Sequence, residues 1–253
     1  MTRRRWIADQ VNGDSASLLG DHAVHLARVL RAKVGEEFDL ATNVDGQARV
    51  RRGTVTSISD NRVDFALGDF VNATLNVAPK ITLALAIFKF DRMEWALEKC
   101  TEIGVAHIIP VIAHRSDPHL AAASMKRHDR WVRLVRQASE QSRRLAPPEI
   151  ALPIKLKDLS GILTPDFPTR VVLSESVVLS ESRKENEGSK LADILQFAPS
   201  EVALAVGPEG GWCDEELSWF RESGWVVASL GNTILRAETA AIVATALAMD
   251  AVR

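Results

Sequence analysis

The chain has 253 residues, of which 46% are hydrophobic and 25% are charged, as in an ordinary globular protein. This composition excludes a disordered chain, a collagen-like chain and a disulfide scaffold. The 31 Lys and Arg residues nearly balance 33 Asp and Glu residues, so the formal net charge is -2. A uniformly basic nucleic-acid-binding protein would have a different balance. The length allows one large domain or two modest ones.

Compartment and metal content are predicted from what the sequence lacks. Its cysteines, Cys100 and Cys213, are too few for a disulfide framework, which favours a reducing compartment. The longest apolar runs, 81–88 and 240–249, fall short of the roughly 20 residues of a transmembrane helix, and the first residues lack the pattern of a signal peptide. The histidines lack a metal-ligand spacing. We therefore expect a cytoplasmic protein with no membrane contact and no metal.

Residues 1–74 are expected to form short strands around one helix. Asp21 is the predicted N-cap of a helix that ends near Ala32, with Val29 and Leu30 contributing to its apolar surface. Runs rich in Val, Phe and Thr, separated by turn residues, predict strands at 38–41, 49–58 and 62–67. Several short strands in so small a segment indicate a barrel or a sandwich.

From residue 80 onward, strand and helix patterns alternate, which predicts an α/β domain with a mainly parallel sheet. Strands are expected at 81–87, 106–113, 171–173, 202–206 and 225–230. Helices are expected at 92–103 and 121–145, near 191, from about 214 and from about 237. The run 81–87 is almost continuously apolar, which is typical of a strand covered on both faces.

Two glycine-containing loops follow predicted strands. Gly207–Gly211 comes directly after 202–206, and the second loop begins at Leu230 and brings Arg236 and Glu238 to the start of a helix. In open α/β sheets ligands bind beyond the carboxyl ends of the strands, so the two loops predict the walls of one pocket. Each loop could instead be a plain turn, with Arg236 and Glu238 forming an ion pair at the helix entry. The chain has no dinucleotide or P-loop fingerprint.

Positive charge is concentrated in one part of the chain. Residues 1–74 are neutral, 115–144 carry a net charge of +5, and the remainder carries -7. Arg133, Arg136 and Arg143 lie at helical spacing on the side opposite the apolar stripe. They could form a solvated face, with Arg136 paired to Glu140 four residues on, or a surface that contacts phosphates.

Five segments, taken in order, resemble the signatures of the RsmE family of 16S ribosomal RNA uridine-N3 methyltransferases. They are HLARVLR at 25–31, EKCTEIGV at 98–105, EQS at 140–142, GPEGG at 207–211 and ILRAETA at 234–240. Three positions depart from the family pattern. After Leu230-Gly231, Asn232-Thr233 stands where the family has x-Arg, Arg143 stands where the family has Gly, and Asp117-Pro118 replaces an apolar pair after Arg115-Ser116.

The resemblance implies an N-terminal PUA-like β-barrel for RNA in residues 1–74. It also implies an α/β methyltransferase domain of the SPOUT superfamily in residues 80–253, with a deep trefoil knot within about 171–253. The implied cofactor is S-adenosyl-L-methionine. The implied partners are 16S rRNA, in the assembled 30S subunit, and a second copy of the chain in a homodimer. No membrane and no metal are expected. Two alternatives stay open: a non-catalytic RNA-binding protein of the same fold, and a metabolite-binding α/β enzyme that does not use RNA.

Given this resemblance, we expect the following roles for individual residues. Arg236 would stabilise negative charge on the uracil, while Glu238 or Glu209 would orient the base or take its proton. The cofactor would contact Leu179, Glu181, Val206, Gly207, Pro208, Gly210, Gly211, Leu230, Gly231, Ile234, Leu235 and Thr239. RNA would contact Arg28, Arg31, Arg115, Arg133, Arg136 and Arg143. Leu179 and Glu181 are chosen because VVLSES occurs twice, at 171–176 and 177–182, and the spacing to the helix near 191 favours the second copy.

Overall fold

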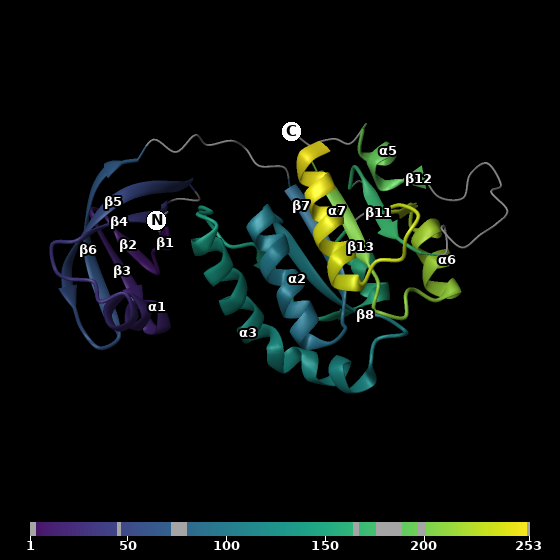
Figure 1. Ribbon diagram of the computed structural model, residues 1–253, viewed down its shortest axis with the longest axis horizontal. Helices are drawn as coiled ribbons and strands as arrows, with labels where there is room; N and C mark the ends of the chain where they lie inside the picture. Colours follow the sequence, from purple (N-terminus) through teal and green to yellow (C-terminus); the bar gives the residue numbers. More distant parts are fainter. Residues whose placement is uncertain are drawn as a thin grey trace. The chain divides into compact units, whose positions relative to one another are not determined.

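The computed structural model divides the chain into two compact units (Figure 1). It describes residues 4–44, 47–71, 80–163, 167–175, 189–196 and 201–251. Unit 1 comprises Met1–Asn76 with Arg136–Pro147, and unit 2 comprises Val77–Val135 with Pro148–Arg253. The boundary between the units falls inside helix α3 (Pro118–Gln141). The sequence gives no sign that residues 136–147 belong with the N-terminal segment. The roles expected for 1–74 and 80–253 stay predictions.

Unit 1 is built on a six-stranded sheet in the order β1-β4-β5-β6-β3-β2. The two edge strands, β1 and β2, follow one another in the sequence. Between them, the Ala8 amide donates to the Ala41 carbonyl and the Asp9 amide donates to the Ser17 carbonyl, both across 2.9 Å. The three predicted strands are present, whereas the first three strands were missed. The strands are β1 (Trp6–Ile7), β2 (Gln10–Asn12), β3 (Ser15–Leu19), β4 (Glu37–Val44), β5 (Gln47–Ile58) and β6 (Arg62–Phe70).

The helix of unit 1 differs from the prediction at both ends. It begins as α1 (Gly20–Val24) and continues as one π-helical turn, η1 (His25–Val29). Asp21 lies in the first turn, and Leu19 occupies the N-cap position without a side-chain cap. The i to i+5 register of a π-turn rotates the residues after it relative to an α-helix. Val29 and Leu30 are therefore 64% and 51% exposed, and the expectation that they supply buried surface was wrong.

Unit 2 contains a sheet in which every pairing among the described residues is parallel, as predicted. Its order is β10-β8-β7-β13-β11-β14-β12, with β9 also beside β8. The strands are β7 (Lys80–Ala86), β8 (His107–Ile112), β9 (Glu149–Ile150), β10 (Ile154–Lys155), β11 (Arg170–Leu173), β12 (Ser189–Lys190), β13 (Glu201–Val206) and β14 (Val226–Ser229). Strand β11, from the first copy of the repeat, lies between β13 and β14.

Helices cover both faces of this sheet. Leu204 faces a core shared with α2 and α7, whereas its neighbours Ala203 and Ala205 face a core that contains Phe220. This explains the continuous apolar runs in the sequence, since both faces of each central strand are buried. Besides α3, the helices are α2 (Phe90–Ile103), α5 (Leu191–Leu195), α6 (Asp214–Glu222), α7 (Ala237–Ala251) and the 3-10 helix η2 (Leu156–Gly161).

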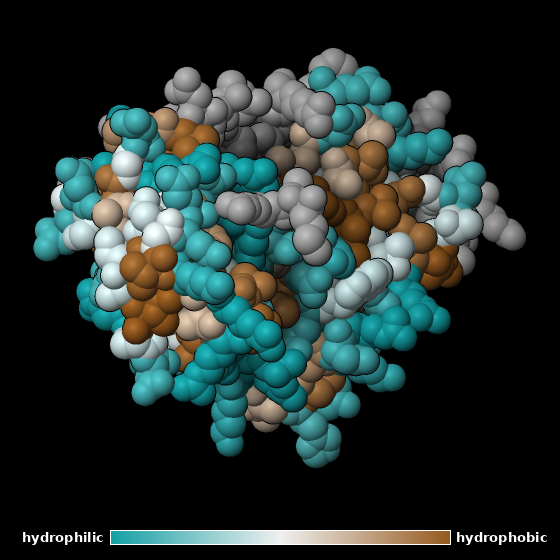
Figure 2. All heavy atoms as spheres, turned by 60° about the vertical axis from the view of Figure 1, so that its left-hand side comes forward, coloured by the Kyte–Doolittle hydropathy of each residue, from teal (hydrophilic) through white to brown (hydrophobic). Residues whose placement is uncertain are grey.

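Helix α3 ends four residues before its predicted end at Leu145. Arg143 adopts a left-handed conformation with φ +61°, and the Arg144 amide donates to the Ser139 carbonyl across 2.9 Å. This is the hydrogen bond of a helix C-terminus closed by a left-handed residue, a position that usually holds glycine. Within the described ranges, no helix has both the length and the apolar character needed to cross a membrane. In the view of Figure 2, hydrophobic side chains form separate groups on a mainly hydrophilic surface.

Candidate functional site

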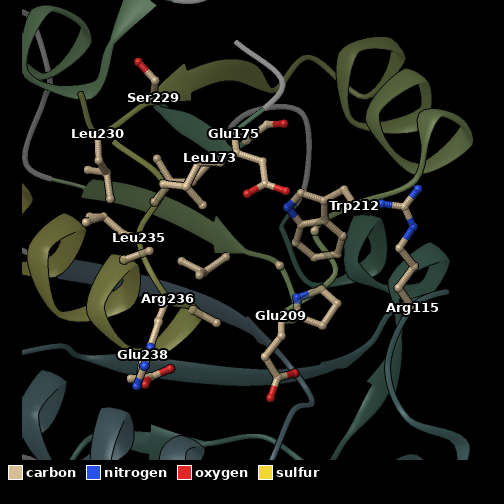
Figure 3. A pocket seen from close by; sticks show the side chains of 18 of the residues that line it. Arg115, Leu173, Glu175, Glu209, Trp212, Ser229, Leu230, Leu235, Arg236 and Glu238 are labelled. Carbon is tan, nitrogen blue, oxygen red and sulfur yellow. The ribbon is translucent and has the colours of Figure 1, made fainter. Parts of the chain in front are cut away.

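A cavity of about 760 Å³ lies in unit 2, where β11, β13 and β14 end (Figure 3). The two glycine-containing loops form its walls, as expected from the rule that ligands bind at the carboxyl ends of parallel strands. Its lining comprises Lys89, Arg92, Arg115, Leu173, Ser174, Glu175, Val206, Gly207, Pro208, Glu209, Gly211, Trp212, Asp214, Leu217, Ala228, Ser229, Leu230, Thr233, Ile234, Leu235, Arg236, Ala237, Glu238 and Ala240. The volume falls in the range of small-molecule and cofactor sites.

The first loop leaves β13 at Gly207 and is shaped around Trp212. A Cβ atom on Gly207 would lie 3.2 Å from Nε1 of Trp212, and Gly211 has φ +68°. Trp212 is 5% exposed, and its Nε1 has no hydrogen-bond partner among the described residues. In Figure 3 this nitrogen points towards the side of the cavity where the Glu175 carboxylate lies. The loop thus holds a buried N–H donor that has no partner among the described residues beside the cavity.

The second loop brings a carboxylate to the start of α7. Glu238 lies in the first turn of α7, where its negative charge is favourable for the helix dipole. Its Oε1 accepts a 3.0 Å hydrogen bond from Nη1 of Arg92 on α2, and its side chain is 4% exposed. The ion pair at the helix entry therefore exists, but Arg92 is the partner instead of the predicted Arg236. Arg236 is exposed and lines the cavity.

The wall beside β8 is held by contacts to the first loop and to α6. Arg115 donates from Nη1 to the Gly210 carbonyl across 2.6 Å. The buried Glu216 carboxylate accepts from the His114 amide at 2.7 Å and from the Cys213 amide at 2.9 Å. This carboxylate both caps α6 and fixes the segment that carries Arg115. Burial raises the pKa of the Cys213 thiol, so this thiol stays protonated at neutral pH.

The structure brings many of the predicted site residues together. Arg236, Glu238 and Glu209 all line the cavity. So do seven of the predicted cofactor contacts: Val206, Gly207, Pro208, Gly211, Leu230, Ile234 and Leu235. Gly210, Gly231 and Thr239 are outside the lining. Their roles, and those of the residues that line the cavity, stay predictions.

The choice of the second repeat copy for this wall needs correction. Leu173, Ser174 and Glu175 of the first copy continue β11 into the cavity. Pairing of β11 with both β13 and β14 places the first copy in the sheet, so the inference from the spacing to the helix near 191 was wrong for this wall. Leu179 and Glu181 lie outside the described residues.

Arg92 and Trp212 were missed as site residues although a signal for each was present. Arg92 lies in the helix that follows β7, and the rule for strand ends applies to β7 as well. Trp212 adjoins the predicted glycine loop, and a tryptophan carries a polar N–H on an apolar ring. Lys89, Glu175 and Asp214 were missed in the same way.

The arginines expected to bind RNA differ in how far the structure engages them. In unit 1, Arg136 is bound to the Asp9 carboxylate at 2.7 Å and to the Ile7 carbonyl at 2.7 Å. Its atoms approach Glu140 only to 3.9 Å, so the expected i, i+4 pair is secondary. Other contacts of these arginines include Arg143 with Asp39 and Arg28 with Asp60 in unit 1, and Arg115 with Gly210 in unit 2. Arg31 and Arg133 are exposed, and a role in RNA binding stays a prediction for all six.

Among the described residues, no group of three or more His, Cys, Asp or Glu side chains is arranged to hold a metal ion. The cavity is instead lined by apolar side chains, backbone and eight charged side chains. An organic molecule with both apolar and polar parts suits such a lining.

Comparison with known proteins defines the class. The model of an RNA methyltransferase domain family matches residues 76–249, so the chain is an RNA methyltransferase-type protein. Among curated relatives, ribosomal RNA small subunit methyltransferase E of Mycobacterium tuberculosis is 32% identical, over 92% of this chain and 85% of the relative. The corresponding protein of Bacillus subtilis is 29% identical, over 90% and 87%. The chain belongs to the ribosomal RNA small subunit methyltransferase E family.

Solved structures agree with this membership. Ribosomal RNA small subunit methyltransferase E from Neisseria gonorrhoeae, bound to S-adenosyl methionine, is 28% identical with a TM-score of 0.76, covering 96% of this chain and 95% of that one. A methyltransferase structure from Legionella pneumophila, in complex with the same cofactor, is 28% identical with a TM-score of 0.78, covering 98% and 96%. The α/β fold is thus that of the family.

Proposed function

We propose that this protein transfers a methyl group from S-adenosyl-L-methionine to N3 of a uridine in 16S rRNA. The observation that carries the proposal is one cavity that combines both glycine loops with Arg236, Glu209 and Glu238. Family membership supplies the reaction class. Because ribosomal RNA is the substrate, the proposal places the enzyme in the cytoplasm, with assembled 30S subunits as its target.

The residues that line the cavity fit this cofactor. Leu173, Leu230 and Leu235 offer apolar surface for an adenine ring. Glu175 supplies acceptor oxygens for hydroxyl or ammonium groups, and the unpartnered Nε1 of Trp212 supplies a donor. The absence of a phosphate-binding fingerprint is consistent with a cofactor that has no phosphate. When bound, the cofactor supplies an electrophilic methyl group on a sulfonium.

The chain's own residues would handle the charge and the proton of the uracil. Methylation replaces the N3–H bond with an N3–CH₃ bond, so the N3 proton must be taken up by a base. Arg236 is exposed in the cavity and would stabilise negative charge on the uracil. Glu238 already accepts a hydrogen bond from Arg92, whereas Glu209 accepts only a long bond of 3.5 Å from the Lys89 amide. Glu209 is therefore the proposed proton acceptor, and Glu238 a positioning group.

Three architectural features belong to the same proposal. The curled sheet of unit 1 would be a PUA-like barrel that contacts RNA. The segment after residue 170 would form a deep trefoil knot, which the position of β11 between β13 and β14 supports, together with the packing of α7 against α2 and α5. Two copies would assemble as a homodimer.

The direct experiment is methyl transfer from radiolabelled S-adenosylmethionine to 30S particles that lack the modification, with mapping of the product. Arg236→Ala is expected to lower the single-turnover rate while RNA binding stays intact. The matched control is Arg221→Ala, because Arg221 is exposed on α6 and does not line the cavity. A wild-type rate for Arg236→Ala would remove Arg236 from the mechanism. A wild-type protein that binds RNA but neither binds the cofactor nor transfers methyl would favour the non-catalytic alternative, and cofactor binding without RNA binding would favour a metabolite enzyme.

A further inference from the structure

Unit 1 carries a second hollow, separate from the cavity of unit 2. Its volume is about 340 Å³, and strands β2, β4, β5 and β6 contribute its walls. The residues that line it are Val11, Gly13, Thr42, Val44, Arg49, Arg51 and Phe70. The volume lies at the low end of small-ligand sites.

The hollow places an aromatic ring beside two cationic groups at the surface. Phe70 is 55% exposed and Val44 is 51% exposed, although both are large apolar side chains. The guanidinium carbons of Arg49 and Arg51 lie 5.3 Å and 5.2 Å from the centre of the Phe70 ring. This distance is within the range of cation–π attraction. The ring is therefore held in position while much of it remains accessible.

Arg51 anchors the hollow, whereas Arg49 is exposed at its rim. The Arg51 side chain is 16% exposed and donates to the carboxylate of Asp14 at 2.8 Å. It also donates to the carbonyls of Gly68 at 2.9 Å and Leu67 at 3.0 Å. Because these contacts exist before any ligand binds, little side-chain entropy is lost on binding. The exposed Arg49 is placed to meet a ligand from solvent.

We propose that this hollow binds one unstacked nucleobase of single-stranded RNA. The Phe70 ring and the Arg49 guanidinium provide the planar surfaces on which a base stacks, and Arg49 supplies positive charge for the adjoining phosphate. None of the described residues that line the hollow is acidic, and the adjacent Asp14 carboxylate is paired with Arg51. The second arginine therefore gives the lining a net positive charge, which favours a polyanion. Identification of the RNA as ribosomal rests on the proposed function, but the capacity to bind a base does not.

The test uses the full-length protein and a fluorescein-labelled oligouridine ten nucleotides long, followed by fluorescence anisotropy at several salt concentrations. Phe70→Ala is expected to weaken binding about tenfold, within the range for the loss of one base–aromatic stack. Phe70→Trp should retain binding, because it keeps an aromatic surface. Arg49→Gln should weaken binding and reduce the slope of log affinity against log salt by about one charge. Lys33→Gln is the charge-matched control, since Lys33 is exposed in unit 1 and does not line the hollow.

The outcomes separate this inference from the proposed function. Wild-type affinity in both Phe70→Ala and Arg49→Gln would overturn the base site, and so would a wild-type protein that does not bind the oligonucleotide. An equal loss in Lys33→Gln would show nonspecific electrostatics instead of a site. If Phe70→Ala fails to fold, as judged by its thermal unfolding, Arg49→Gln decides alone. Methyl transfer to 30S particles by the wild type is measured in parallel. Its absence would contradict the proposed function but would not change the conclusion about the base site.

Discussion

The Arg92 guanidinium on α2 holds the carboxylate of Glu238 at the start of α7, with Nη1 and Oε1 3.0 Å apart. The Glu238 side chain is 4% exposed, whereas that of Arg92 is 47% exposed. Arg92 and Glu238 are 146 positions apart in the sequence, so the pair joins α2 to α7. It also fixes a carboxylate at the cavity wall that carries Arg236.

Removal of the Arg92 side chain should therefore lower both the free energy of unfolding and the catalytic rate, with the larger effect on the rate. Arg92→Ala leaves the buried Glu238 carboxylate without this donor, at a cost of about 1–3 kcal/mol, and the misplaced group should lower kcat on the order of tenfold or more. Arg92→Lys should recover part of kcat, because it restores a positive charge. The measurements are urea unfolding and steady-state methylation with kcat and KM determined separately. Unchanged kcat in Arg92→Ala would show that the pair is only structural.

Gly207→Ala tests whether the first loop forms the cofactor site. The added Cβ would lie 3.2 Å from Nε1 of Trp212, so the loop and the indole in the cavity wall must move apart by a few tenths of an ångström. We expect the affinity for S-adenosylmethionine, measured by calorimetry, to fall roughly tenfold, equivalent to about 1.4 kcal/mol. Gly161→Ala is the matched control, because a Cβ there meets nothing within 4 Å. Equal affinities for the two variants would contradict the assignment.

Trp212→Phe tests the buried N–H group itself. Nε1 of Trp212 has no partner among the described residues, while the ring packs against Phe220 with centroids 4.9 Å apart. Phenylalanine keeps an aromatic ring and removes the donor. If a ligand uses this donor, cofactor affinity should fall by a factor that corresponds to about 1 kcal/mol, and the smaller ring should separately lower the unfolding free energy, because Trp212 is 5% exposed and part of the core. Trp219→Phe, next to the same ring but outside the cavity lining, should bind cofactor normally. Normal binding by Trp212→Phe would mean that the ligand leaves this group unpaired.

Arg143 offers a test of backbone strain at the end of α3. Its φ of +61° is a conformation that favours glycine, and its guanidinium pairs with Asp39 on the surface. Arg143→Ala and Arg143→Gly both lose this ion pair and differ only in the Cβ atom. Arg143→Gly should therefore be more stable than Arg143→Ala by about 1 kcal/mol in urea unfolding. The reverse order would show that the left-handed conformation does not persist.

Cys100 should make stability depend on pH in the alkaline range. Burial raises the pKa of this thiol to about 12 from its ordinary value of 9.0, opposed by a hydrogen bond from Thr245. The folded state therefore keeps the thiol neutral while the unfolded state ionises, so the stabilisation is complete below pH 9 and is lost between pH 9 and about 12. In that window the wild type should lose up to about 1.4 kcal/mol per pH unit more than Cys100→Ala. Parallel curves of unfolding free energy against pH would contradict this assignment.

Much of unit 2 could be predicted because its strands are covered on both faces and therefore appear as apolar runs. The loop after Val206 and the loop after Ser229 carry glycines at strand ends, and the rule for parallel sheets places them together. The ion pair of Arg92 with Glu238 could not be predicted in this way. It depends on which helix lies beside α7, which is a property of the sheet order and not of local sequence.

Unit 1 was harder to predict, for two physical reasons. Strands β1, β2 and β3 are two, three and five residues long, too short to show alternation. The π-turn at His25–Val29 changes the helical period, so a 3.6-residue pattern assigned Val29 and Leu30 to the wrong face. The tandem VVLSES repeat is ambiguous from sequence, because identical segments can be distinguished only by their pairing.

The pairing of β7 with β13, in which Lys80 lies opposite Glu201, has a consequence for folding during synthesis on the ribosome. Strand β7 leaves the ribosome long before the partner that completes its hydrogen bonds, and unit 1 likewise recruits residues 136–147. Contacts so distant in sequence carry a large loop-closure cost and slow folding. A fragment that stops at residue 76 lacks part of its own unit, and a chain halted before β13 exposes the edge of β7. Folding of this protein should accordingly be largely post-translational, with unpaired strand edges that a chaperone can hold.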